Sequence, residues 1–187
     1  MCPPRNVPPQ SLWAEYARTV NAAHRAVHDA YRAYRQRPGE PALKAAWETA
    51  AAHFHRVLTE YPPGFWQALD RLKADDAAGL EDVLAFLEAD PWCFRSGYAR
   101  QTALRAITRV PLSPRATARL QRVVLNAIDG RDRREFRWYC RLARRVLSPD
   151  FIAAIEARLE SPDDGVRRRA RWVLNAIEKH GPLTPER

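Results

Sequence analysis

Apolar side chains recur at steps of three and four residues along the first part of the chain, and this spacing most limits the possible fold. They fall at Trp13, Tyr16, Val20, Ala23, Val27, Ala30 and Tyr34. Because an α-helix makes one turn in about 3.6 residues, these positions form one seam along a long helix. No stretch of the sequence shows the sustained alternation of apolar and polar residues that is typical of a strand. We therefore expect an all-α protein.

A second seam of the same kind follows the first. Its apolar positions are Leu43, Trp47, Ala50, Phe54, Val57 and Tyr61. The intervening sequence "RPGEP", residues 37–41, contains proline and glycine, which are poor helix formers. Two helices joined by so short a loop pack side by side in opposite directions. Residues 11–61 are therefore predicted to form an antiparallel helical hairpin.

Shorter helices are predicted after the sequence "YPPG", residues 61–64. Their expected ranges are about 64–74, 77–89, 95–110, 114–129, 132–147, 149–160 and 163–179. "LSP" at 112–114 and 147–149, and "SP" at 161–162, punctuate these segments. Serine accepts a hydrogen bond from a free backbone N–H at a helix start, and proline fits the first helical position. These sites are therefore expected to begin helices.

Three segments share a further pattern, in which an arginine is followed three residues later by a small side chain. They are "ARQTAL" (99–104), "FRWYCRL" (136–142) and "VRRRARW" (166–172), with the pairs Arg100 and Ala103, Arg137 and Cys140, and Arg167 and Ala170. Small side chains allow neighbouring helices to approach closely, and spacings of 37 and 30 residues fit a stack of helix pairs.

On these residues the chain resembles HEAT-like α-helical repeat proteins over about residues 80–180. The resemblance is strongest at 151–177, where an outer helix, an Asp/Pro turn and an inner helix follow one another. It implies that residues 62–180 form a short, curved α-solenoid of about three helix pairs, with the hairpin packed on it. It also implies that Arg167 pairs with Asp163 or Asp164 of the preceding turn. Solenoids of this kind bind other molecules, and the resemblance identifies no ligand.

Charge is distributed unevenly along the chain. The net charge is +9, but residues 1–90 hold 10 basic and 12 acidic side chains, whereas residues 91–187 hold 21 basic and 10 acidic ones. Arginine outnumbers lysine by 28 to 3, which codon usage could explain. Codon usage does not explain why the second half lacks matching acids, so an anionic partner for that half is a reasonable hypothesis.

Several classes of protein are excluded by what the sequence lacks. No apolar run approaches the roughly 20 residues of a membrane span, and the first residues do not resemble a secretion signal. The three cysteines are odd in number and have no CxxC spacing, so we predict neither a disulfide framework nor a zinc ribbon. We also predict no metal and no cofactor. Residues 1–10 and 181–187 are expected to be disordered ends. The expected location is the cytoplasm.

The first candidate site is a ridge of arginines. On a helical wheel for residues 132–147, arginines gather on the face opposite the apolar side chains, with Trp138 beside them. Guanidinium groups bind phosphate and an indole ring stacks on bases, so the ridge could bind nucleic acid. The alternative is that Trp138 fills a groove between repeats and the arginines are solvated. The predicted ridge, with contributions from the last helix, is Arg134, Arg137, Trp138, Arg141, Arg144, Arg145, Arg168, Arg169 and Arg171.

The second candidate is the aromatic insert "DPWCFRSGY", residues 90–98. It is interpreted either as a packed junction or as a recognition loop, whose binding residues would be Trp92, Phe94, Arg95 and Tyr98. His24 and His28 have a spacing that can place two imidazoles on one metal ion, but the third ligand would have to be Asp29, or His53 or His55 of the facing helix. A polar helix surface explains these histidines better.

No catalytic motif is present, such as a phosphate-binding loop, a GxSxG nucleophile or a zinc-binding HExxH. The leading hypothesis is a non-enzymatic scaffold that binds a protein partner through its curved repeat surface, with the hairpin supporting self-association. The alternative is a nucleic-acid-binding protein that uses the arginine-rich half. A third hypothesis rests only on analogy: some HEAT-like proteins are DNA glycosylases that use Trp and Asp side chains, but no such motif maps onto this chain.

Overall fold

The computed structural model describes residues 9–183. Within this range it contains α-helices and two short 3-10 helices, Ala77–Gly79 and Ala157–Glu160, and no strand, which confirms the all-α prediction. Of the predicted disordered ends, residues 1–8 and 184–187 lie outside the described residues, whereas Pro9 and Gln10 belong to the first helix, contrary to the prediction. The α-helices are α1 (Pro9–Gln36), α2 (Pro41–Thr59), α3 (Phe65–Lys73), α4 (Leu80–Ala89), α5 (Ser96–Ile107), α6 (Pro114–Asp129), α7 (Phe136–Ala143), α8 (Pro149–Glu156) and α9 (Asp164–His180).

The chain divides into two compact units. The first comprises the residues up to Trp66 together with Ala89–Ser96, the loop that joins α4 to α5. The second comprises Gln67–Glu88 and the residues from Gly97 onward. The first unit therefore includes part of the segment that was assigned to the repeats from sequence.

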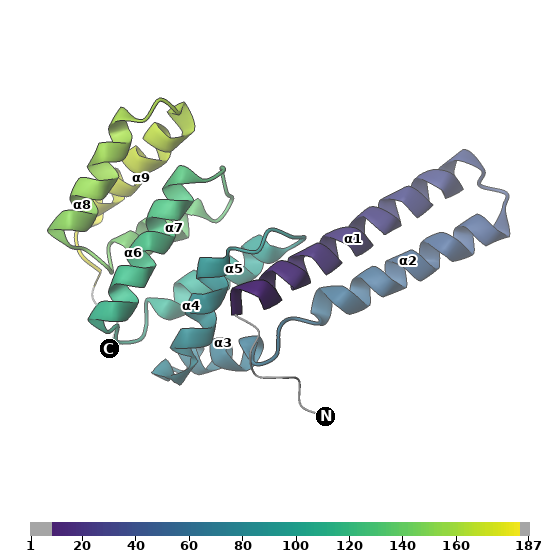
Figure 1. Cartoon of the computed structure of the whole chain (residues 1–187), viewed down its shortest axis with the longest axis horizontal. Helices are drawn as coiled ribbons and strands as arrows, with labels where there is room; N and C mark the ends of the chain where they lie inside the picture. The colour runs from purple at the N-terminus through teal and green to yellow at the C-terminus, as the bar shows by residue number, and fades with distance from the viewer. Residues whose placement is uncertain (1–8, 184–187) are drawn as a thin grey trace. The chain divides into compact units, whose positions relative to one another are not determined.

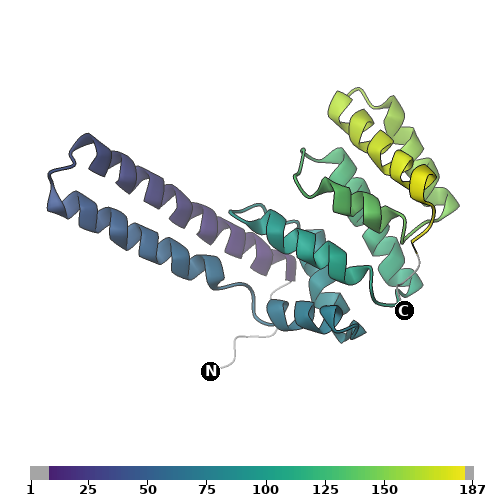
Figure 2. The ribbon, with the colours of Figure 1, turned by 180° about the vertical axis from the view of Figure 1, so that it is seen from behind.

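In the first unit, α1 and α2 lie side by side along their length (Figures 1 and 2). Four residues of loop separate them, and Pro41 occupies the first helical position of α2, where its missing N–H costs nothing. The seam of apolar residues is buried at Val20, Phe54 and Val57. Near the ends of these helices, the rings of Trp13 and Phe65 meet edge-on with centroids 5.0 Å apart.

The parts of α1 and α2 nearest their connecting loop are loosely packed. Between Ala23 and Phe54 the described side chains include none that is buried, although Val27, Tyr34 and Trp47 continue the seam. Tyr34 and Trp47 stack at 5.7 Å between ring centroids. Two helices alone shield a seam from only two sides, so this part of α1 and α2 remains half-exposed.

In the second unit, α6 lies beside α7 and α8 beside α9 (Figure 1). The starts of two helices follow the sequence prediction, because the hydroxyls of Ser113 and Ser148 accept hydrogen bonds from backbone N–H groups at the beginnings of α6 and α8. The third Ser-Pro site does not begin a helix. Ser161 ends a 3-10 turn, and Asp163 caps α9 instead.

Helix α7 is shorter than the predicted helix of residues 132–147. At its N-terminal side, the carboxylate of Glu135 accepts a hydrogen bond of 2.5 Å from the buried Arg100, and Asp132 binds arginines of α9. These contacts fix the preceding residues as a loop. At its C-terminal side, the N–H of Arg145 bonds to the carbonyl of Leu142, which tightens the chain into a turn before Pro149.

Ion pairs and close backbone approaches join the other helices of this unit. The guanidinium of Arg119 on α6 forms a fork with the Glu88 carboxylate of α4 at 2.8 and 2.7 Å and also reaches Glu81 at 2.6 Å. The hydrogen bond from Arg119 lowers the pKa of Glu88. A Cβ at Gly79 would lie 2.0 Å from the backbone oxygen of Ala68 on α3, so only glycine fits there.

Candidate functional site

A cationic pocket in the second unit is the strongest candidate site. Its volume is about 430 Å³, which is within the range of roughly 300–1,000 Å³ typical of ligand pockets. The end of α3, the face of α5 with the turn after it, and α7 all contribute. Its described lining includes four cations and no acidic side chain, and is formed by Lys73, Thr102, Arg105, Ala106, Thr108, Arg109, Trp138 and Arg141.

Helix geometry explains why α5 supplies so much of this lining. Thr102, Arg105 and Ala106 share one face of α5, because positions i, i+3 and i+4 lie together on a helix. Arg109 lies in the turn after α5 and lines the pocket from there. The opposite face of α5 is the buried one, with Ala103, Leu104 and Ile107 among the most enclosed side chains of the unit, so the polar face is left for the pocket.

Acids outside the pocket orient two of the four cations. Lys73 lies 2.8 Å from the carboxylate of Asp70, and Arg109 binds both oxygens of Asp75 at 2.9 and 3.4 Å. These side chains are largely exposed, so the ion pairs contribute little to stability. They do restrict where the cations point, which favours a defined binding geometry.

Trp138 forms part of the pocket wall, and guanidinium groups already lie over its ring. The Cζ atoms of Arg105 and Arg137 are 5.1 and 5.2 Å from the ring centroid, within the range of cation–π interactions. The indole Nε1 is buried without a hydrogen-bond partner. Trp138 is half-buried, and this arrangement corresponds to the groove-filling interpretation more closely than to an open platform for stacking bases.

The predicted arginine ridge is divided among several environments. Arg141 lines the pocket, and the exposed Arg137 lies over Trp138. Arg134 lies before α7 and places its guanidinium 4.0 Å from the ring centroid of Tyr98, with one nitrogen 3.5 Å from the side-chain oxygen of Gln101. Tyr98 was predicted as part of the aromatic loop, so the structure brings together one residue from each candidate site.

Two ridge arginines beyond the end of α7 bind backbone carbonyls. Arg144 donates to the carbonyl oxygens of Gly181 and His180 at 2.8 and 3.0 Å, at the C-terminus of α9 where carbonyls lack helical partners. Arg145 reaches the carbonyl of Val110 at 3.4 Å, and its Nε is buried without a hydrogen-bond partner. Both side chains therefore hold segments of the unit together.

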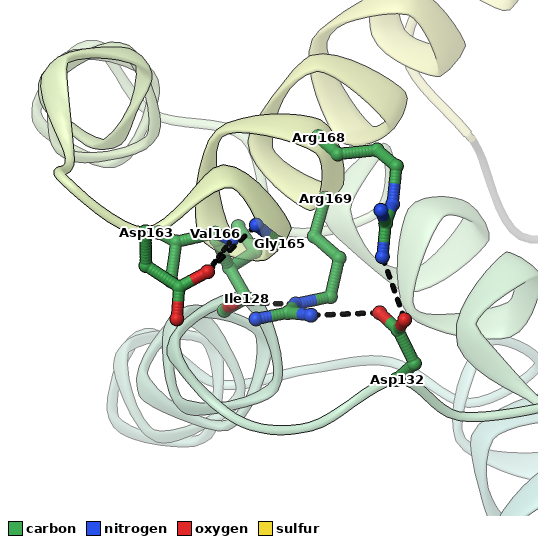
Figure 3. A network of polar contacts seen from close by, with 7 residues as sticks. All are labelled: Ile128, Asp132, Asp163, Gly165, Val166, Arg168 and Arg169. Atoms are coloured by element: carbon green, nitrogen blue, oxygen red, sulfur yellow. Dashed lines mark hydrogen bonds and ion pairs between the residues drawn. The ribbon is translucent and has the colours of Figure 1, made fainter.

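The arginines of α9 make similar internal contacts (Figure 3). Arg169 is only 3% exposed and donates to the carbonyl of Ile128 and to the carboxylate of Asp132, both at 2.7 Å. Arg168 binds the other oxygen of Asp132 at 2.6 Å. These hydrogen bonds, with that from Arg169 dominant, lower the pKa of the Asp132 carboxyl.

Arg169 thus points into the unit rather than onto the predicted surface, and Arg168 is paired with an acid. Arg171 is exposed on α9. The expected pairing of Arg167 with an acid of the preceding turn is confirmed, because its guanidinium contacts Asp164. The nine predicted residues therefore do not gather around one place, and only Arg141 and Trp138 lie at the pocket.

Residues 90–95 of the aromatic insert form a well-anchored loop in the first unit, whereas Ser96 begins α5 and Tyr98 lies in the second unit. The carbonyl of Trp92 accepts a hydrogen bond of 2.8 Å from Asn21 of α1, and Phe94 packs against Phe54 of α2 with ring centroids 5.3 Å apart. Trp92 is nevertheless 47% exposed. Arg95 lies over Phe94 at 5.5 Å and has a positive φ of 63°, a conformation that side chains other than glycine seldom adopt. The loop therefore both packs on the helices and presents an exposed indole.

The paired histidines have close neighbours but no further metal ligands. The Nε2 atoms of His24 and His28 are 3.2 Å apart, and His24 packs on Phe54 and Phe94. Over residues 9–183, no three His, Cys, Asp or Glu side chains come close enough together to hold a metal ion. In the same range, no helix combines the length and the apolar character needed to cross a membrane.

Sequence reasoning missed Lys73, Arg105 and Arg109. Arg105 shares a face of α5 with Thr102, and that polar face could have been found from the sequence, whereas Arg109 lies in the turn after the helix. Lys73 lies on a different helix, and its presence at the pocket depends on the packing of α3 near α5. Comparisons with models of protein families, with curated proteins and with solved structures each find no match.

Proposed function

We propose that the chain is a non-enzymatic interaction module, in which the second unit is a short HEAT-like array that binds a protein partner. The pocket of Lys73, Arg105, Arg109 and Arg141 binds acidic side chains of that partner. The observation that carries this proposal is the convergence of four cations from three helical segments on one pocket. Guanidinium groups form paired hydrogen bonds with carboxylates, which gives such a pocket specificity as well as attraction.

The arrangement of buried arginines supports the repeat-like stacking within this proposal. Arg100 of α5 and Arg169 of α9 both bind the loop that precedes α7, through Glu135 and Asp132 respectively. In a stack of helix pairs, α5 and α9 would be the neighbours of α7 on either side. Two buried arginines that bind one loop from two helices are consistent with that order.

The alternative of nucleic-acid binding has less support from the contacts. A nucleic-acid track requires a row of available cations, but Arg144, Arg145 and Arg169 bind carbonyls or an acid within the unit. Trp138 already carries two guanidinium groups, as described above. For the glycosylase analogy, no Asp is among the described residues that line the pocket with Trp138.

The first unit supports assembly in this proposal. The half-exposed seam of Val27, Tyr34 and Trp47 would be enclosed if a second copy of α1 and α2 completed a four-helix bundle. Sedimentation equilibrium of the full chain tests this point. A dimer that becomes monomeric in Tyr34→Glu is expected, and a wild-type chain that is monomeric at all concentrations would contradict it.

Binding to a labelled 20-residue poly-glutamate peptide tests the pocket. At 50 mM salt we expect binding that is lost in the charge-reversed pair Arg105→Glu and Arg141→Glu. The control pair is Arg115→Glu and Arg171→Glu, which alters net charge equally on exposed helix positions of the same unit and should retain binding. An equal loss in both pairs would show that only the overall charge matters.

The same titration with single-stranded and double-stranded DNA decides the alternative. Binding through 6–10 phosphates weakens by about 10³–10⁵ between 50 and 200 mM salt. DNA binding of that kind, weakened by both variant pairs, would favour a nucleic-acid-binding protein over the interaction module.

A further inference from the structure

Resting on the proposed function, we infer that the pocket of Lys73, Arg105, Arg109 and Arg141 recognises a phosphate monoester on a side chain of the protein partner, so that phosphorylation of the partner controls binding. The first reason is charge. Four cations line the pocket and no acid is among its described lining, and Asp70 and Asp75 pair with two of these cations. A phosphorylated side chain, with a charge of about −1.5 to −2 near pH 7, gains more from such a lining than a carboxylate with a single negative charge.

The second reason is the kind of hydrogen-bonding group that the pocket offers. The hydroxyls of Thr102 and Thr108 donate to the backbone carbonyls of Tyr98 and Arg105 at 3.1 and 2.8 Å. Apart from the buried indole N–H of Trp138, the side-chain N–H donors of the lining therefore belong to its four cations. A phosphate monoester has three terminal oxygens that accept such charge-assisted bonds, whereas a carboxylate has two.

The third reason is that Arg105 is positioned before a ligand arrives. Its guanidinium lies over the Trp138 ring at 5.1 Å, while the side chain remains exposed enough to reach an anion. Arg141, which lies three residues after Trp138 on α7, lines the same pocket from the next turn. A guanidinium held in place loses less conformational freedom when it forms a two-pronged contact with phosphate.

The local character of the pocket distinguishes a single phosphorylated residue from a nucleic acid. Three of the cations that would extend the site along α7 and α9, Arg144, Arg168 and Arg169, bind within the unit at backbone carbonyls or at Asp132. The volume of about 430 Å³ holds a phosphate group and part of the residue that carries it, since a water molecule takes roughly 30 Å³. The cations Lys73, Arg105 and Arg109 are exposed, so a small free phosphate compound would stay largely open to solvent.

The test uses three labelled peptides of identical sequence, ten residues long, that carry phosphoserine, glutamate or serine at the central position. In fluorescence anisotropy with the full chain at 150 mM salt and pH 7.5, we expect the phosphoserine peptide to bind at least about tenfold more tightly than the glutamate peptide. The pair Arg105→Ala and Arg141→Ala should remove this preference, and the control pair Arg115→Ala and Arg171→Ala should retain it. Circular dichroism checks that each variant is folded.

The pH dependence of the preference for phosphoserine over glutamate distinguishes a phosphate ligand from a nonspecific effect of the protein's charge. The second pKa of a phosphate monoester is near 6, so the preference should shrink between pH 7.5 and 5.5. The charged groups at the pocket are Lys73, Arg105, Arg109 and Arg141, with Asp70 and Asp75 paired to two of them. No histidine, the side-chain type that ordinarily titrates in that interval, is among the described residues of the lining. A preference that stays constant over it would contradict the inference.

The outcomes separate this inference from the proposed function. If the glutamate peptide binds as tightly as the phosphoserine peptide, the inference fails and the proposed function stands. If none of the peptides and no poly-glutamate binds, both fail. If a 20-nucleotide DNA binds more tightly than the phosphoserine peptide and the control pair weakens it, the ligand is a nucleic acid. If free phosphoserine binds as tightly as the peptide, the pocket is a small-molecule site, and the inference of a protein partner is overturned.

Discussion

The buried ion pair between Arg100 and Glu135 offers the sharpest test of how the second unit is held together. Arg100 is 0% exposed and its Nη1 lies 2.5 Å from the Glu135 carboxylate, whose residue is 3% exposed. Removal of one partner from a buried pair costs about 3–5 kcal/mol, because the remaining charge loses that partner while it stays out of water. We expect Glu135→Gln to cost about 3 kcal/mol, since the amide oxygen still accepts a hydrogen bond but carries no charge.

The assay is urea unfolding of the full chain followed by circular dichroism. With a slope of about 1–3 kcal/mol per molar urea, a loss of 3 kcal/mol moves the midpoint of the second unit down by about 1–3 M. The matched control is Asp75→Asn, which breaks an exposed pair with Arg109. Surface pairs contribute about 0–1 kcal/mol, so this control should move the midpoint far less.

A paired replacement separates the charge from the contact. In the double variant Arg100→Met with Glu135→Met, both charges are absent and apolar side chains of similar length fill the space. Such replacements of buried pairs are often neutral or stabilising, so the double variant should be more stable than Glu135→Gln. The reasoning is refuted if Glu135→Gln is as mild as Asp75→Asn, or if the double variant is less stable than the single one.

Three further outcomes follow from local contacts. Gly79→Ala should destabilise the second unit strongly because the added Cβ would lie 2.0 Å from a backbone oxygen, whereas Gly39→Ala, with nothing within 4 Å, should be neutral or slightly stabilising in thermal melts. Ser148→Ala should cost about 0.5–2 kcal/mol in urea unfolding through loss of the cap of α8. For Asp132, whose pKa is lowered chiefly by Arg169, the stabilisation is present above the unfolded pKa near 4 and is lost as the pH falls through the folded value. The difference in unfolding free energy between the wild type and Asp132→Asn should therefore shrink from pH 5 to pH 2.5.

Helical periodicity predicted the class of fold and most helix positions, because the buried face of a helix is formed by residues that are close together in the sequence. The seam that begins at Trp13 and the caps at Ser113 and Ser148 depend on residues three or four positions apart, and the structure has helices at those places. The length of α7 could not be predicted in this way. In place of its predicted first turn the structure has a loop, in which Glu135 binds Arg100, 35 residues away in the sequence. A helical wheel contains no information about such a partner.

The same limit explains why the predicted arginine ridge and the pocket differ. A wheel orders arginines by angle around one helix axis, so Arg144 and Arg145 seemed to extend the row begun by Arg137 and Arg141. The helix ends at Ala143, and beyond it the angles no longer apply. Whether an arginine is available to a ligand depends on whether a carbonyl or an acid of another segment lies within its reach. The availability of an arginine therefore depends on how several helices pack together. For this reason, a cluster of cations in the sequence predicts an anion site less well than a pocket lined by cations from three segments of the folded chain.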